Sequence, residues 1–269
     1  MAGAVHRLTL FGATGRMGQS ILQALQATPQ WQLASAVASA GSGRLGEDAA
    51  AEGRATGVPL ASDPVAALAG ASVAIDFSVA AAVSAHAAAC AAAGVPLLVG
   101  TTGLDEATLQ ALRLASARVP VLVAPNTSVG VGVLAELVAA ATRALGPGFD
   151  VEILEAHHHA KRDAPSGTAL KLGEAVAAAR GQPLSDLAAL DRASGGGARR
   201  PGSIGFAVVR AADIVGEHTV IFATPGERLE LTHRATDRLT FARGALRAAA
   251  WLVGRTPGYY RMENVLREA

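Results

Sequence analysis

Hydrophobic and polar positions along the first half of the chain form two alternating kinds of segment. Short apolar runs have the length of buried β-strands, and they lie at Arg7–Phe11, Gln32–Val37, Val73–Phe77, Val95–Val99 and Val119–Ala124. Longer stretches with helical spacing predict helices at Met17–Gln26, Ala80–Ala93 and Asp105–Ala117. Strands that alternate with helices in this way predict a parallel, doubly wound sheet.

The second half of the chain has a different pattern. It predicts a long apolar helix over Gly130–Leu145, a strand over Val151–Ala156 and a helix over residues 167–180. A closing helix and three strands joined by turns are predicted further on, the helix at Phe241–Val253 and the strands at Ile204–Arg210, His218–Ala223 and Arg228–Ala235. Consecutive strands joined by turns are typical of a mixed or antiparallel sheet.

The two patterns together predict an α/β chain with two domains. Residues 1–127 are expected to form a Rossmann-type dinucleotide-binding domain, which residues from about 241–269 complete. Residues 128–240 are expected to form a second, α+β domain with a mixed or antiparallel sheet.

Composition supports a layered architecture and argues against one class of partner. Apolar residues make up 51% of the 269 residues but aromatic residues only 4%, so alanine supplies much of the core and helices must approach the sheet closely. Lysine and arginine number 23 and aspartate and glutamate 22, and no basic patch stands out beyond Arg199-Arg200. This charge balance argues against nucleic-acid binding.

The sequence shows no targeting or membrane segment. The N-terminus lacks the apolar core and cleavage pattern of a signal peptide. The most apolar stretch, Val79–Val99, is rich in weakly hydrophobic alanine and contains Ser84, His86 and Pro96, so it predicts a helix, a turn and a strand. The single cysteine, Cys90, excludes an intrachain disulfide framework and is typical of a buried apolar position. We therefore expect a cytoplasmic protein that does not bind membranes.

A glycine-rich turn directly follows the first predicted strand. Gly12, Gly15 and Gly18 have GxxGxxG spacing, a variant of the usual dinucleotide fingerprint, and open the first helix. In order, these glycines permit a tight turn, close approach of the backbone to a pyrophosphate, and close packing of the helix on the strand. The helix N-terminus offers N–H groups and a positive dipole end to phosphates. Glycines also mark ordinary turns, but this position between strand and helix favours dinucleotide binding.

Residues after the second predicted strand bear on the choice of cofactor. A carboxylate that binds the ribose hydroxyls usually lies about 20 residues beyond the turn, where this chain has Ala38-Ser39. Nothing there repels a 2′-phosphate, and Arg16 and Arg44 can favour one. We expect NADPH to be accepted, while rejection of NADH does not follow.

Two later loops lie where cofactors bind in open α/β sheets. Gly-Thr-Thr-Gly at 100–103 and Ala-Pro-Asn-Thr at 124–127 each follow a predicted strand, at the carboxyl edge of the sheet. Taken alone, each loop is equally well explained as an ordinary turn.

The densest group of reactive side chains follows the first predicted strand of the second domain. The segment His157-His158-His159-Ala160-Lys161 contains three of the seven histidines. Consecutive residues do not share one face of a helix or strand, and no second cluster has ligand spacing, so we expect no metal. A solvated polar loop explains the charges, but not the position between a strand end and a helix start.

The next predicted helix begins with the features of an anion-binding site. Pro165 prevents helix before it, Ser166 can cap the N-terminus, and Gly167 and Thr168 present backbone N–H groups. An ordinary capped helix is the alternative. Beside imidazoles and an ammonium group, which donate protons or neutralise a carboxylate, anion binding is the better interpretation.

Together these motifs resemble the 4-hydroxy-tetrahydrodipicolinate reductases, also called dihydrodipicolinate reductases, of bacterial lysine and diaminopimelate biosynthesis. The resemblance covers nearly the whole chain, and the His-His…Lys…Asp-Ala-Pro-Ser-Gly-Thr stretch is very specific to that family. The other matching segments are Gly12–Gly18, Asp76-Phe77-Ser78, Gly100–Gly103, Ala124-Pro125-Asn126, Glu155–His158 and Asp213–His218.

The resemblance implies an oxidoreductase that reduces 4-hydroxy-tetrahydrodipicolinate with NADPH or NADH, as a homotetramer. Its second domain would bind the substrate and form the oligomer. The proton donor falls on His157 and the catalytic lysine on Lys161, while a small cyclic dicarboxylate would contact His158, Ser166, Gly167 and Thr168. Cofactor contacts fall on Gly12, Ala13, Thr14, Gly15, Arg16, Met17, Phe77, Gly100, Thr101, Thr102, Ala124, Pro125, Asn126 and Thr127.

The chain departs from the family pattern at one point, because members that use NADH well carry an acid and an arginine where this chain has Ala38-Ser39. Two other functions fit the sequence less well than a reductase of this family. Another two-domain dehydrogenase does not explain the segment 157–168, and a non-catalytic dinucleotide sensor has no need for it. His159 has no predicted role, His6, His86 and His233 are expected to be ordinary packed or surface residues, and the loop before His218 is expected to be structural.

Overall fold

The structure is a computed structural model that describes residues 5–51, 53–191 and 197–268. The chain forms two compact units. Unit 1 combines Met1–Ser128 with Arg238–Ala269, and unit 2 comprises Val129–Asp237. Within the described ranges, none of the helices has the length and apolar character needed to cross a bilayer.

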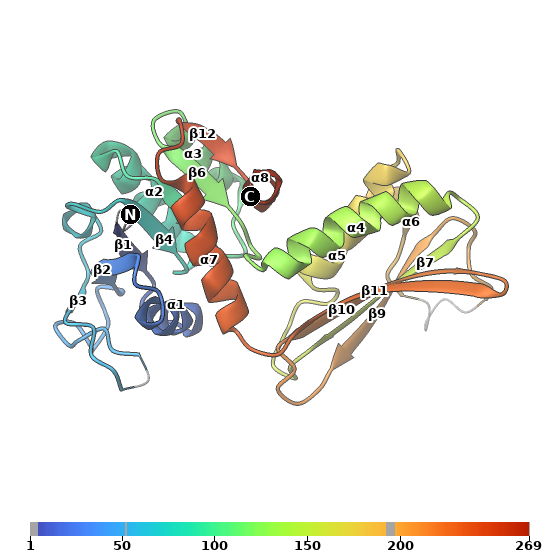
Figure 1. Cartoon of the computed structure of the whole chain (residues 1–269), viewed down its shortest axis with the longest axis horizontal. Helices are drawn as coiled ribbons and strands as arrows, with labels where there is room; N and C mark the ends of the chain where they lie inside the picture. Colours follow the sequence, from blue (N-terminus) through green and yellow to red (C-terminus); the bar gives the residue numbers. More distant parts are fainter. Residues whose placement is uncertain (1–4, 52, 192–196, 269) are drawn as a thin grey trace. The chain divides into compact units, whose positions relative to one another are not determined.

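Among the described residues of unit 1, seven strands form one parallel sheet in the order β12-β6-β5-β4-β1-β2-β3 (Figure 1). This is the strand order of the Rossmann fold, with β12 added at one edge. The chain adds β2 and β3 on one side of β1, and β4, β5 and β6 on the other, so the strand order reverses between β1 and β4. The parallel, doubly wound sheet is as predicted. The strands are β1 His6–Phe11, β2 Trp31–Val37, β3 Leu60–Ala61, β4 Val73–Asp76, β5 Leu97–Val99, β6 Pro120–Val123 and β12 Gly258–Tyr260.

Helices pack on both faces of this sheet. Helix α1 packs beside α7, and α2 beside α3 (Figure 1). The core between the α2–α3 pair and the sheet joins large strand side chains such as Leu97 and Val121 to small helix residues such as Ala87 and Ala115. The elements are α1 Arg16–Gln26, the 3₁₀ turn η1 Ala66–Leu68, α2 Ala80–Ala93, α3 Glu106–Ser116, α7 Leu239–Leu252 and α8 Met262–Arg267.

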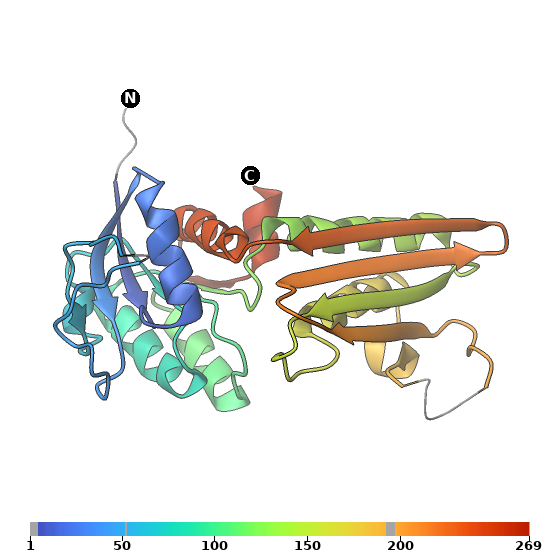
Figure 2. The ribbon, with the colours of Figure 1, turned by 90° about the horizontal axis from the view of Figure 1, so that it is seen from below.

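Unit 2 contains a mixed sheet in the order β11-β10-β7-β9-β8. Strand β10 is antiparallel to both neighbours, whereas β7, β9 and β8 are parallel. Helices α4 and α5 lie on one face of the sheet (Figure 2). The elements are α4 Val129–Leu145, β7 Asp150–His157, α5 Gly167–Ala179, α6 Leu184–Leu187, β8 Ala188–Ala189, β9 Ile204–Arg210, β10 Gly216–Thr224 and β11 Glu227–Ala235.

Candidate active site

The first histidine of the predicted cluster ends strand β7. His157 is 9% exposed, and its Nδ1 lies 2.5 Å from Oε2 of Glu155. Residues two apart on a strand point to the same face, so strand geometry brings this carboxylate and imidazole together. Glu155 is almost fully buried, and had no predicted role.

The Glu155 carboxylate accepts hydrogen bonds from several directions. Arg210, the last residue of β9, donates to both carboxylate oxygens at 2.7 Å, and the backbone N–H of Ser166 donates to Oε1 at 2.9 Å. Burial by itself would raise the pKa of Glu155, but hydrogen bonds from Arg210, His157 and Ser166 outweigh it and hold this pKa below its usual value. Glu155 is therefore an anion at neutral pH.

An ionised Glu155 fixes the orientation of the His157 ring. Because a carboxylate only accepts, Nδ1 of His157 is the donor, and Nε2 is left to gain or lose a proton. Burial lowers the pKa of His157; Glu155 opposes this, and the positive charges of Lys161 and Arg210 add to the lowering. A protonated His157 is thus a stronger acid than an ordinary histidine.

His218 packs against His157 from the neighbouring strand. The two rings meet edge to face with centroids 5.1 Å apart. Gly216 and Glu217, which were expected to lie in a loop before the strand, belong to β10, and its alternating burial begins there. Burial, helped by the charge of His157, lowers the pKa of His218 to about 3, so its ring is neutral. A Cβ at Gly216 would lie 3.2 Å from Nε2 of His157, so this glycine leaves room for the His157 ring.

Ser166 caps helix α5, as predicted, by accepting a hydrogen bond from the N–H of Ala169. Its Oγ also lies 3.1 Å from Nε2 of His218, and its own N–H binds Glu155. Both polar groups of Ser166 are thus engaged within unit 2. Its position suits holding the helix start beside the histidines rather than touching a ligand.

Lys161, His158 and Gly167 lie around this cluster with more exposure. Nζ of Lys161 lies 2.8 Å from Oδ1 of Asp163, and the N–H of Lys161 donates to the carbonyl of His158. Gly167 is exposed, and a Cβ placed there would meet no heavy atom of the described residues within 4 Å. The following residue, Thr168, is half-buried. Open space therefore borders the N-terminus of α5.

His159, which had no predicted role, is held away from this cluster. Its N–H and its Nδ1 both lie within hydrogen-bond distance of the Ala212 carbonyl oxygen, at 3.2 and 2.9 Å. The exposed ring therefore joins the loop after β7 to the loop after β9.

In unit 1 the predicted cofactor residues gather at one edge of the sheet. The last residues of four adjacent strands are in register, with Phe11 opposite Asp76, Asp76 opposite Val99, and Val99 opposite Val123. The loops that follow these strands therefore begin side by side at the carboxyl edge, where the strand order reverses. Open α/β sheets bind their ligands at this point.

Close packing between these loops explains three of the glycines. Gly12 has a φ of +78°, and a Cβ there would lie 2.5 Å from the Phe77 carbonyl oxygen. A Cβ at Gly18 would lie 2.2 Å from the Gly12 carbonyl oxygen, and one at Gly100 would lie 2.2 Å from the Phe77 ring. Helix α1 follows Gly15, which has no side chain to cap it, so its first N–H groups suit a phosphate.

Exposure differs among the remaining predicted cofactor residues. Thr14, Arg16, Thr102 and Pro125 are exposed, Met17 and Asn126 are half-buried, and Ala13, Thr101, Ala124 and Thr127 are buried. The hydroxyl of Thr127 donates to the Phe241 carbonyl at 2.7 Å, so it serves packing within unit 1. Arg44, predicted to favour a 2′-phosphate, lies 2.9 Å from Glu47 in an exposed ion pair.

Comparison with known proteins adds to this geometry. Residues 6–127 match the family described as dihydrodipicolinate reductase, N-terminus, and residues 130–266 match dihydrodipicolinate reductase, C-terminus. The chain belongs to the dihydrodipicolinate reductase family. Membership makes it an oxidoreductase that works with a nicotinamide cofactor, as the resemblance predicted.

Individual members of the family align over almost their whole length. The 4-hydroxy-tetrahydrodipicolinate reductase of Thiobacillus denitrificans is 50% identical over 261 residues, which is 97% of this chain and 98% of that protein. That of Anaeromyxobacter dehalogenans is 50% identical over 262 residues, with 97% of each covered. A dipicolinate-bound dihydrodipicolinate reductase structure from Paenisporosarcina sp. TG-14 has a TM-score of 0.77 at 25% identity, covering 97% of this chain and 100% of that one.

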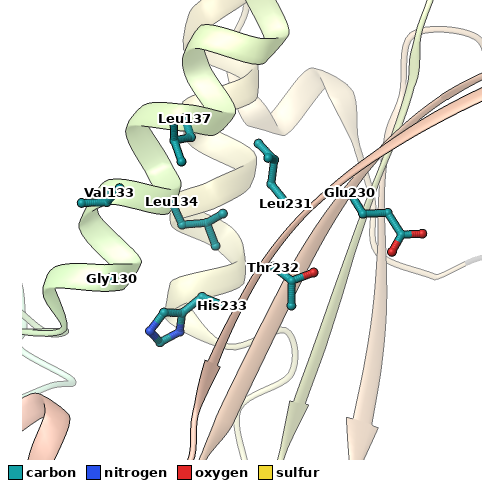
Figure 3. A pocket seen from close by; sticks show the side chains of 8 residues that line it. All are labelled: Gly130, Val133, Leu134, Leu137, Glu230, Leu231, Thr232 and His233. Atoms are coloured by element: carbon teal, nitrogen blue, oxygen red, sulfur yellow. The ribbon is translucent and has the colours of Figure 1, made fainter.

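Two further observations delimit the site. Among the described residues, no group of three or more His, Cys, Asp or Glu side chains could hold a metal ion. A groove of about 370 Å³ lies in unit 2 between α4 and β11 (Figure 3). Leu134, Leu137, Leu231 and His233 are among its lining residues, and His233 lies directly opposite His218 in the register of β10 and β11.

Proposed function

We propose that this chain reduces 4-hydroxy-tetrahydrodipicolinate to tetrahydrodipicolinate in lysine and diaminopimelate biosynthesis. Unit 2 would hold the substrate, and the loops at the carboxyl edge of unit 1 would bind NADPH or NADH. The observation that carries the proposal is the buried Glu155–His157 pair beside the open N-terminus of α5. A proton donor and a carboxylate-binding helix start suit a cyclic imino-dicarboxylate, and a relative was solved with dipicolinate bound.

The chemistry first requires loss of water, in which the hydroxyl leaves C4 and a proton leaves the adjacent ring carbon. C4 then gains a hydride, and the adjacent carbon gains a proton. The bound dihydronicotinamide supplies the hydride. His157 donates the proton from Nε2. Glu155 accepts the hydrogen bond from Nδ1–H of His157 and stabilises the imidazolium before the proton is transferred. Because burial and nearby cations lower the pKa of His157, this proton is released readily.

The substrate carboxylates are assigned to two groups in unit 2. Lys161 would bind one of them, exchanging its partner Asp163, which is 58% exposed at the side chain and so easily displaced into water. The backbone N–H groups of Gly167 and Thr168 would bind the other, helped by the positive end of the α5 dipole. These contacts also place charge where the developing negative charge of the ring needs stabilising.

Substitutions in the cluster test the function directly. We expect His157→Gln and Lys161→Ala to fold normally but to lose on the order of 10²-fold or more in kcat, the usual scale for a general acid or a charge stabiliser. His159→Gln is the matched control and should keep wild-type turnover, because its ring is exposed and its Nδ1 lies 2.9 Å from the Ala212 carbonyl oxygen. Steady-state oxidation of NADPH and NADH with the enzymatically generated substrate measures this. Wild-type kcat in folded His157→Gln would remove His157 as the donor, and a wild type that does not turn over would refute the function.

We further propose that both cofactors are used, with a moderate preference for NADPH. Ala38 is buried and Ser39 exposed, so the ribose region presents no carboxylate at these positions. Breaking the exposed Arg44–Glu47 pair costs little, which leaves Arg44 and Arg16 available to a 2′-phosphate. One charge-assisted contact contributes roughly 1.5–3 kcal/mol, or about ten- to a hundredfold in affinity.

Measuring kcat/KM with both cofactors tests this preference. Ser39→Glu should lower kcat/KM for NADPH about tenfold through repulsion and change that for NADH much less. Ser39→Gln has a similar size without the charge, and it should leave both values near wild type. A wild-type preference for NADH of tenfold or more would contradict the prediction. A homotetrameric assembly stays a prediction from the resemblance, and a cytoplasmic location stays a prediction from the sequence composition.

A further inference from the structure

A buried ionisable pair lies beneath the cofactor loops of unit 1. Asp76, the last residue of β4, has no exposed surface, and its Oδ2 lies 2.8 Å from Nδ1 of His86 on helix α2. His86 is packed, as expected, but its partner is a buried carboxylate. Burying a carboxylate is costly unless it is paired and hydrogen-bonded, so this arrangement needs a reason beyond core packing.

The other oxygen of Asp76 joins two loops. Oδ1 accepts hydrogen bonds from the N–H of Ser78 at 2.8 Å and from the hydroxyl of Thr101 at 3.2 Å. Ser78 follows β4, and Thr101 follows β5. Between them, the Phe77 ring fills the space where a side chain at Gly100 would lie. One carboxylate thus fixes both loops relative to each other.

His86 in turn fixes the carboxylate. Its ring stacks on Phe11 with centroids 4.1 Å apart and planes 8° from parallel, and Phe11 directly precedes Gly12. One helical turn further on, burial, and then the charge of Asp76, raise the pKa of the Cys90 thiol, so Cys90 stays neutral beside the pair. His86 is thereby held between an aromatic ring at the end of β1 and the acid at the end of β4.

We propose that His86 is a positioning residue for the cofactor. Acting through Asp76, it holds the loops after β4 and β5 in the shape that accepts the dinucleotide. The inference rests on the proposed function to the extent that Phe77 and Gly100–Thr102 contact the cofactor. A purely structural pair would stabilise unit 1 without a specific effect on cofactor affinity, and the two cases are separable.

Two substitutions at His86 make the separation. His86→Leu removes the donor to Asp76, whereas His86→Asn places an amide N–H near the position of Nδ1 and can restore it. Ser84→Ala is the control on the same helix, because the Ser84 hydroxyl donates to Thr108 on α3 at 3.4 Å rather than to Asp76. The intact chain is titrated with NADPH alone, followed by nucleotide fluorescence, and then assayed with both substrates.

We expect His86→Leu to raise the Kd and KM for NADPH roughly tenfold, the scale of one buried hydrogen bond. Its kcat at saturating NADPH and its KM for the dicarboxylate should stay within about twofold of wild type, because the pair does not touch the chemistry. His86→Asn should recover most of the lost affinity, and Ser84→Ala should bind like wild type.

An unchanged Kd in folded His86→Leu would overturn the proposal, and so would an equal loss in His86→Leu and His86→Asn. If His86→Leu does not fold, Thr101→Val removes the same link at the loop, and an unchanged Kd in that variant overturns the proposal instead. NADPH binding is measured without substrate, so its outcome is independent of whether the wild type reduces the proposed substrate.

Discussion

His157 and His218 differ sharply although their rings touch. The His157 ring has the Glu155 carboxylate as its partner, whereas Nε2 of His218 has the hydroxyl of Ser166 as its partner. A carboxylate offsets part of the burial cost of a charged imidazole, and a hydroxyl does not. A neutral His218 therefore lies against a His157 that can titrate, and it adds no charge of its own to repel the proton that His157 donates.

The depressed pKa of His218 predicts how unit 2 responds to acid. In the unfolded chain His218 binds a proton as the pH falls through about 6.5, while in the folded chain it stays neutral down to about 3. Its contribution to stability is thus complete above pH 6.5 and is lost as the pH falls. Between pH 7 and pH 5 the wild type should lose about 2 kcal/mol more of its unfolding free energy than His218→Gln.

Hydrogen exchange of the β7 and β10 amides, corrected for its intrinsic pH dependence, measures this difference. His218→Gln is suitable because its side-chain amide has both a donor and an acceptor with which to replace Nε2 as the partner of the Ser166 hydroxyl. All other titrating groups are common to both proteins, so the difference isolates His218. Equal pH slopes for the two proteins would show that His218 is protonated in the folded state.

At the level of elements, the sequence pattern predicted the strands and helices that are recognisable from neighbouring residues alone. The apolar runs and helical stretches of the first half correspond to strands β1, β2, β4, β5 and β6 and to helices α1, α2 and α3. Strands β3 and β12 and helix α8 were not predicted. Their two, three and six residues are too short for a period to be recognised. Strand β12 exists because Tyr259 pairs with Val121, far away in sequence.

The residues of the candidate site also fall into those that local sequence predicts and those that only the fold brings together. The sequence placed His157, Lys161 and the capped start of α5 together because they are close along the chain. Arg210 lies 55 residues from Glu155, and only the parallel register of β7 with β9 brings them into contact. The position of His218 was within reach of a period-two pattern, since Val220 and Phe222 continue its buried face.

His86 could not be recognised from its helix. Helix α2 is composed mostly of alanine, so its sequence marks no distinct buried face on which a histidine would stand out. Its partner Asp76 ends strand β4, and only the folded arrangement of sheet and helix brings the two side chains into contact. Tertiary pairs of this kind leave no local periodicity.

At the scale of the whole molecule, unit 1 is assembled from both ends of the chain. The returning segment contributes α7, which packs beside α1, and the edge strand β12. The two segments lie very close at Gly244, where a Cβ would lie 1.8 Å from the Thr127 carbonyl oxygen. The Thr127 hydroxyl donates to Phe241 of the same helix. The loop after β6 is thus held by a helix that follows it by more than a hundred residues.

This arrangement predicts that Gly244→Val destabilises unit 1 and weakens cofactor binding, although Gly12–Gly18 is untouched. Overpacking typically costs 1–3 kcal/mol, and we expect about 3 kcal/mol because the opposing atom is backbone and cannot rotate away. Both tryptophans, Trp31 and Trp251, belong to unit 1, so urea unfolding followed by tryptophan fluorescence reports on this unit alone. Gly148→Val in unit 2 is the control, because a Cβ there would meet none of the described atoms within 4 Å. A tryptophan transition and an NADPH Kd that both match the wild type in Gly244→Val would show that the returning helix does not support the cofactor loops.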